Sequence, residues 1–161
     1  MTQTAAPFHA LQPLLWPEPG VSTERDLYFK TEGLAAFSGA TRTLIFGPGG
    51  MADFRTATNL FNLGKWRQHC GLRNLNLRLE GAGRFELVVF QATNVMSWNR
   101  LVNEVVDLPE DQPFRLDLTP LLEPDPLGVV FFTLRALGEG KLTGAVWETR
   151  DAPKRTPKLT L

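Results

Sequence analysis

The chain has one cysteine, two histidines and no excess of either charge, and these absences exclude several classes of protein. Cys70 cannot form an internal disulfide, and no group of cysteines and histidines has the spacing of zinc ligands. Seventeen lysines and arginines balance seventeen aspartates and glutamates, so the basic excess typical of nucleic-acid-binding domains is missing. We expect a protein with no metal site, no cofactor and no nucleic-acid partner.

Long apolar runs are absent as well. No stretch approaches the roughly 20 residues of a membrane-spanning helix. The N-terminal stretch MTQTAAPFHALQPLLW lacks the basic start and the continuous apolar core of a signal peptide. Since a lone cysteine also fits a reducing compartment, the sequence predicts a cytoplasmic protein without a membrane span.

A sustained 3.6-residue hydrophobic period is missing, and most of the chain alternates with a period of two instead. In RNLNLRLEGAGRFELVVF, residues 73–90, every second residue from Leu75 is apolar, and Gly81 to Gly83 (GAG) predicts the tight turn of a β-hairpin. GVVFFTLRALG, residues 128–138, is apolar on both sides at first, which indicates a central strand. The other predicted strands are TRTLIFGPGG, ADFRTATNLF, PFRLDLTPLL and GKLTGAVWET. This pattern predicts an all-β sandwich or jelly roll of about eight antiparallel strands.

Both ends of the chain differ from this alternating part. Residues 1–25 are rich in proline, which disfavours helices and central strands, so we expect an extended N-terminal arm. Its apolar anchors are Leu11, Leu14, Leu15 and Trp16. Residues 26–149 form the predicted sandwich, and the charged, proline-spaced residues 150–161 resemble a linker. KLTL at the very end has the pattern of a beginning strand, so we expect the natural protein to continue.

The sequence motifs of common enzymes are also missing. There is no Gly-x-Ser-x-Gly, no phosphate-binding loop and no His-Glu-x-x-His. EPDP brings Glu123 and Asp125 close together, as in a metal-dependent sugar transferase, but acids between prolines are more typical of a turn. His9 and His69 have no evident acid partner for proton transfer. We expect no catalytic residues, and hence no enzyme activity from this chain by itself.

Tryptophans among polar residues suggest a different role, because sugars stack their C–H faces on exposed aromatic rings beside hydrogen-bonding side chains. Trp98 has Asn99 and Arg100 next to it and is expected in a loop after a strand. Trp66, beside Arg67, is a second candidate. A tryptophan of a small sandwich more often closes the core, however, and that interpretation is favoured for Trp66.

The segment ATNLFNLGKWRQHCGLRNLNLRLEGAGRFELVVFQA, residues 57–92, resembles the N-terminal β-sandwich domain of galactofuranosyltransferase-type family 2 glycosyltransferases. That family has the pattern T-Y-F-N-x-F-x-x-x-Y-W-R-R before two strands, and this chain keeps five of its residues in similar order: Thr58, Phe61, Asn62, Trp66 and Arg67. LQPLLWPEPGVSTERDLYF is similar to the family's opening arm. Lys65 and Gln68 depart from the pattern, which has a tyrosine and a second basic residue there.

The resemblance implies a non-catalytic accessory domain that positions a glycan acceptor or packs against other parts of a bacterial glycosyltransferase. Its partners would be a catalytic domain in the same polypeptide, a glycan and further copies of the chain, and membrane association would come only through the full enzyme. An alternative is a free-standing, lectin-like carbohydrate-binding protein that uses Trp98, Asn99 and Arg100. A third, weaker hypothesis is a small β-barrel enzyme that uses His69.

Overall fold

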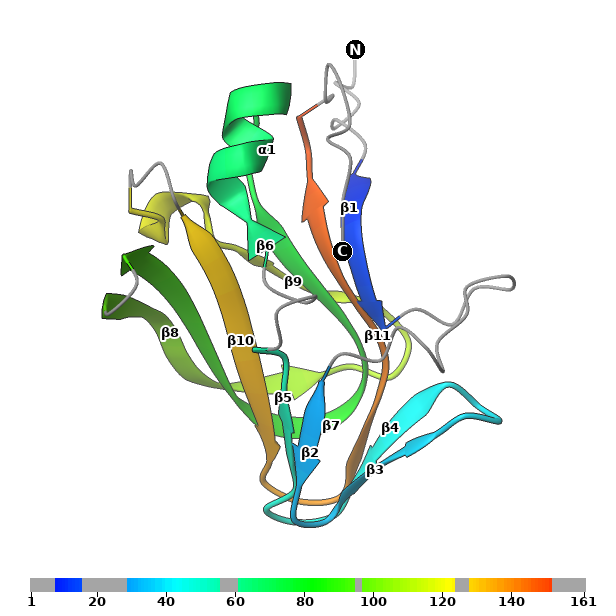
Figure 1. Cartoon of the computed structure of the whole chain (residues 1–161). Coiled ribbons are helices and arrows are strands. Elements are labelled where there is room, and N and C mark those ends of the chain that lie inside the picture. Colours follow the sequence, from blue (N-terminus) through cyan, green and yellow to red (C-terminus); the bar gives the residue numbers. More distant parts are fainter. Residues whose placement is uncertain (1–7, 16–28, 56–60, 95–96, 124–127, 152–161) are drawn as a thin grey trace.

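The computed structural model describes residues 8–15, 29–55, 61–94, 97–123 and 128–151. Within these ranges the chain forms eleven β-strands, one α-helix and one 3-10 helix, η1 (Thr119–Leu121). Every strand pairing is antiparallel. The strands form two sheets that share the long strand β7 (Asn76–Asn94) and enclose the core between them (Figure 1). The predicted all-β sandwich class is confirmed, with more strands than the expected eight.

Sheet A contains the N-terminal half of β7. Its other strands are β1 (His9–Leu15), β3 (Ala35–Ser38), β4 (Thr43–Phe46), β9 (Phe114–Asp117) and β11 (Gly140–Thr149). β11 pairs with β7 on one edge, and β4 and β1 pair with successive parts of its other edge. β9 and β3 lie outermost, on β7 and β4 respectively.

Sheet B contains the C-terminal half of β7. Its other strands are β2 (Lys30–Glu32), β5 (Met51–Asp53), β6 (Phe61–Asn62), β8 (Ser97–Leu108) and β10 (Val129–Ala136). β7 lies between β8 and β10, and β10 pairs on its far edge with β6 and then β5. β2 completes the sheet beside β5. The central position predicted for residues 128–138 is confirmed, because β10 has neighbours on both edges.

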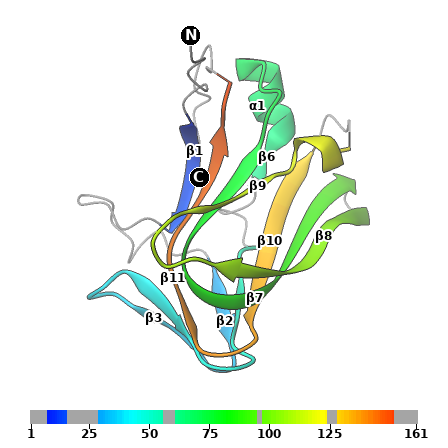
Figure 2. The same ribbon diagram turned by 180° about the vertical axis from the view of Figure 1, so that it is seen from behind.

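The predicted hairpin turn at GAG is wrong, since β7 continues through it as one strand. The strand pairs with sheet A up to Ala82 and with β8 of sheet B from Gly83 onward, so this is the point where it bends from one sheet into the other (Figure 2). Gly83 has a backbone φ of 126°, which residues other than glycine rarely adopt. A Cβ on Gly81 would collide with the backbone of Lys141 and Leu142 on β11. The glycines therefore permit a close crossing of two strands, and not a turn.

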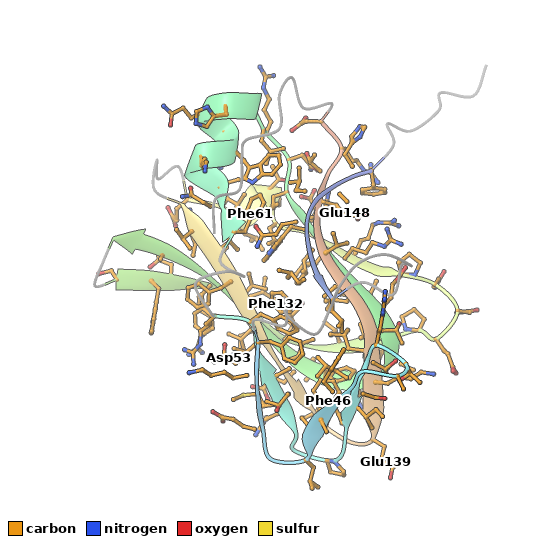
Figure 3. The ribbon with its side chains drawn as sticks, turned by 45° about the vertical axis from the view of Figure 1, so that its right-hand side comes forward. Phe46, Asp53, Phe61, Phe132, Glu139 and Glu148 are labelled. Atoms are coloured by element: carbon orange, nitrogen blue, oxygen red, sulfur yellow. The ribbon has the colours of Figure 1, made fainter. Side chains whose placement is uncertain are left out.

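The core consists of apolar side chains from the facing sides of both sheets. Phe132 of sheet B and Trp147 of sheet A meet with ring centroids 5.7 Å apart, edge to face. Phe132 also stacks on Phe54, and Phe46 packs against Phe85. In Figure 3 the aromatic side chains fill the space between the two sheets, which is what makes the sheets a sandwich.

The stretch NLFNLGKWRQHC ends in a short helix, α1 (Leu63–Cys70), at one end of the sandwich (Figure 1). Asn62 caps it, because its side-chain oxygen accepts a hydrogen bond of 2.9 Å from the backbone N–H of Lys65. Trp66 is 2% exposed and stacks on Phe61 with centroids 5.9 Å apart. Trp66 therefore closes the core, as the favoured interpretation predicts.

In the N-terminal segment, residues 9–15 pair with β11, and the expected anchors Leu11, Leu14 and Leu15 are buried. Trp16, Thr58, Asp125 and residues 152–161 lie outside the described residues, so the expectations for them remain predictions. No helix in the described ranges is long and apolar enough to cross a membrane.

Candidate functional site

The outer face of sheet B carries an aromatic group in an otherwise polar setting. Phe85, Leu87 and Val89 of β7 point into the core with no exposed surface, so Phe90 and Ala92 alternate to the outside. The strand register places Trp98 of β8 opposite Ala92. It likewise aligns Phe131 of β10, Phe90 of β7 and Arg100 of β8 in one row across three strands.

Three rings from three strands form this group. The centroids lie 5.1 Å apart for Phe90 and Phe131, 6.0 Å for Phe90 and Trp98, and 5.8 Å for Trp98 and Phe131. Trp98 extends from β8 across β7 and contacts Phe131 of β10. The side chain of Phe131 is only 4% exposed. Trp98 itself is 59% exposed. We call Phe90, Trp98 and Phe131 the aromatic platform, in which two phenylalanines support one open indole.

A pocket of about 330 Å³ lies beside the platform, lined by Lys30, Asp53, Arg55 and Trp98. Its lining comes from three places in the sequence, β2, the end of β5 and the start of β8. Pairing of Lys30 with Asp53 brings the first two together. The volume is at the lower end of the range for small-ligand sites.

Asp53 fixes the guanidinium of Arg55 at this pocket. Arg55 Nε lies 2.9 Å and 2.8 Å from the two Asp53 carboxylate oxygens, and Nη2 lies 2.7 Å from Oδ2. The backbone N–H of Arg55 donates to the same carboxylate at 3.0 Å. The hydrogen bond with Asp53 is the largest cause of a pKa of Arg55 above its ordinary value, and it outweighs desolvation. Arg55 is thus a permanently charged donor held in one orientation.

Of the three neighbouring residues predicted to bind carbohydrate, Trp98, Asn99 and Arg100, only two belong to this site. Trp98 lies within β8, so its predicted place in a loop is wrong. Arg100 lies opposite Phe90, on the face that carries the platform. Asn99 lies opposite the buried Gln91, which places it on the other face of the strand. The structure therefore joins Trp98 and Arg100, and separates Asn99 from them.

The second predicted group lies elsewhere. Trp66 is buried against Phe61 and offers no open ring face to a sugar. Arg67 Nη1 donates to the backbone oxygen of Glu123 over 3.5 Å. Gln91 holds the same segment, since its amide donates to Glu123 O at 3.1 Å and accepts from Glu123 N at 2.8 Å. Arg67 thus helps to hold a chain segment at the helix end of the sandwich.

Sequence reasoning missed Lys30, Asp53 and Arg55. Asp53 and Arg55 stand two apart in ADFR, so a strand would present both on one face, and this signal was available. Nothing in the sequence connects them with Trp98, because the connection depends on which strands pair with β10.

A larger hollow of about 670 Å³ lies beside the middle of β7, where this strand passes from sheet A into sheet B. It is lined by Ile45, Phe46, Gly47, Ala82, Gly83, Glu139, Gly140 and Lys141. Lys141 is engaged there by Glu110 at 3.1 Å, and the hollow has no exposed aromatic ring among its lining residues. In the ranges that the structure describes, no three His, Cys, Asp or Glu side chains gather as metal ligands would. The aromatic platform and its pocket are therefore the better candidate.

Comparisons with known proteins give a structural likeness and no match in sequence. No protein-family model matches the chain, and no curated protein does. The chain is similar to a solved family 29 carbohydrate-binding module, with 10% identity, 89% of this chain and 90% of that one covered, and a TM-score of 0.46. Variants of such a module in complex with mannohexaose and with cellulohexaose each show 11% identity over 91% of this chain and 94% of theirs, with TM-scores of 0.47 and 0.44. These values assign no ligand to this chain.

Proposed function

We propose that this chain is a non-catalytic carbohydrate-binding domain, and that its binding surface is the aromatic platform with the adjoining pocket. One observation carries the proposal: a 59% exposed tryptophan is held by two phenylalanines beside a pocket with fixed polar side chains. The exposed indole, with two further rings beside it, provides apolar contact area for a partner. A sugar offers an apolar C–H face to the indole and hydroxyls to the pocket at the same time.

The pocket's polar residues suit that division of roles. Arg55 uses Nε and Nη2 for Asp53, and Nη1 has no hydrogen-bond partner among the described residues. A guanidinium held in one orientation loses little further freedom when it donates to a ligand hydroxyl. The platform therefore supplies contact area, and Arg55 supplies a directed donor.

Isothermal titration with a panel of oligosaccharides tests the proposal. If Trp98 covers about 60 Å² of a bound sugar, that contact is worth roughly 1.5 kcal/mol, so Trp98→Ala should weaken binding about tenfold. Trp98→Phe, which keeps a ring, should lose less. Ile45→Ala is the matched control, because Ile45 is 54% exposed but lines the other hollow. If wild type binds no oligosaccharide of the panel, the proposal fails.

A second candidate is an accessory domain of a glycosyltransferase in the cytoplasm, where the same surface would hold the acceptor glycan for a catalytic domain. The resemblance of residues 57–92 to the galactofuranosyltransferase-type domains supports it. Of the residues that carry this resemblance, Phe61 and Trp66 are buried, so they serve the fold and not the contact with sugar. If this role is real, adding this chain to the separately produced catalytic domain of such an enzyme should raise the glycan-transfer rate of that catalytic domain. An unchanged rate, with no association between the two, would contradict it.

A further inference from the structure

The charges around the aromatic platform do not cancel as they do elsewhere on sheet B. Asp53 is fully engaged by Arg55, so this pair contributes little net charge. Lys30 lies opposite Asp53 in the register and lines the same pocket as Trp98. The positive charge of Lys30 is thus left over after the other two charged residues of the pocket have paired.

Arg100 is a second cation on this face. It lies opposite Phe90 of the platform, on the strand that carries Trp98, and it is exposed. Neither Lys30 nor Arg100 makes an ion pair or a hydrogen bond through its side chain with any residue that the structure describes. Lys30 shares the pocket with the indole, and Arg100 follows the indole along β8. Two cations therefore lie on either side of one stacking surface.

Other cations of sheet B have acidic partners. Arg135 Nη2 lies 2.7 Å from Glu86 Oε2, and Arg84 Nε lies 3.5 Å from Asp107 Oδ1. Glu32 is a further acid whose charge acts on Arg55 of the pocket, where it raises the pKa of the guanidinium. Glu32 lies opposite Met51, one outward-facing row beyond Lys30 and farther from the platform. Because the whole chain has no net charge, the excess at the platform is a local property.

We propose, resting on the function proposed above, that the glycan is acidic: an oligosaccharide with carboxylates, as in uronic acids. Its sugar ring stacks on Trp98 while carboxylates of the same chain reach Lys30 and Arg100. Two single cations at separate positions match one negative charge per sugar. A phosphate, with nearly two negative charges on one group, would instead need clustered cations. The guanidinium of Arg100 also fits the planar, two-oxygen geometry of a carboxylate.

The test uses one oligosaccharide in two forms, an oligouronate and the same chain after reduction of its carboxyls to alcohols. Calorimetry should show tighter binding of the acidic form, and raised salt should weaken only that form. Lys30→Gln and Arg100→Gln should each weaken the acidic form about two- to fivefold, the effect of one exposed charge pair. Both substitutions should weaken binding of the reduced form less than binding of the acidic form. Lys141→Gln is the control, since it removes the same charge at the other hollow.

The outcomes separate this inference from the function on which it rests. Equal binding of both forms, or variants without effect, would overturn the acidic-glycan inference and leave carbohydrate binding intact. Tighter binding of a sulfated or phosphorylated oligosaccharide than of the oligouronate would overturn the choice of carboxylate. Absence of binding by any of these ligands and by the neutral panel would overturn both. Circular dichroism of each variant, compared with wild type, confirms that a lost affinity is not a lost fold.

Discussion

Replacement of Glu148 by glutamine should destabilise the fold far more than the same change at an exposed ion pair. Glu148 is 2% exposed on sheet A, and its two carboxylate oxygens lie 3.0 Å from Arg78 Nη1 and 3.1 Å from Arg115 Nε. In Figure 3 it lies across the core from Asp53, on the other sheet. A glutamine removes the charge and turns an amide N–H₂ toward one arginine. Two guanidinium groups then lose their shared anion.

The size of the effect follows from burial. Breaking a buried ion pair by removing one partner costs about 3–5 kcal/mol. Arg78 keeps Glu80 as a partner at 2.6 Å, and both arginines retain part of their exposure to water. We therefore expect the lower part of that range, about 3 kcal/mol. For a domain of this length this lowers the melting temperature by roughly 6–12 °C.

The assay is urea denaturation of wild type, Glu148→Gln and the matched variant Glu86→Gln. Glu86 makes a shorter contact of 2.7 Å with Arg135, but both side chains are substantially exposed. Its loss should cost no more than about 1 kcal/mol. The unfolding slope should stay the same in all three proteins. If the two variants lost equal stability, burial of Glu148 would not be what gives this ion pair its importance.

Two further substitutions test the fold and the roles assigned to the tryptophans. Gly81→Ala should cost roughly 2–3 kcal/mol of unfolding free energy, because the added Cβ collides with the β11 backbone. Gly138 has open space around it, so Gly138→Ala should stay within about 0.5 kcal/mol of wild type in the same denaturation assay. Trp66→Ala should cost about 3–5 kcal/mol of unfolding free energy as a core truncation, and Trp98→Ala no more than about 1 kcal/mol. A larger loss of unfolding free energy in Trp98→Ala than in Trp66→Ala would contradict the assignment of Trp66 to the core and Trp98 to the surface.

The alternation of apolar residues was enough to predict the strands that lie deep in the sandwich. β11 matches the predicted GKLTGAVWET from end to end, and β10 occupies the predicted central place. Burial on one or both faces leaves a regular pattern in such strands, and that pattern is visible in a single sequence.

Features that depend on contacts between distant strands could not be predicted in this way. Glycines at 81 and 83 fit a tight turn and a close strand crossing equally well, and only the position of β11 decides between them. β8 was missed because most of its residues are exposed at the edge of sheet B, so its alternation is weak. Trp98 was therefore recognised as a candidate by its neighbours in sequence, and misplaced in a loop.

The candidate site shows the same limit. Its lining residues stand at positions 30, 53, 55 and 98, and strand pairing alone brings them together. Asn99 looked equivalent to Arg100 in sequence, but one step along a strand places it on the opposite face.

Nuclear magnetic resonance mapping during a glycan titration tests the central claim most directly, because it locates the binding surface without any substitution. We expect the signals of the Trp98 indole N–H and of the backbone amides of Lys30, Arg55 and Arg100 to shift together, with one dissociation constant. Amides around Ile45 and Lys141, at the other hollow, should stay in place. Shifts confined to that hollow, with the Trp98 indole unmoved at saturation, would contradict the account.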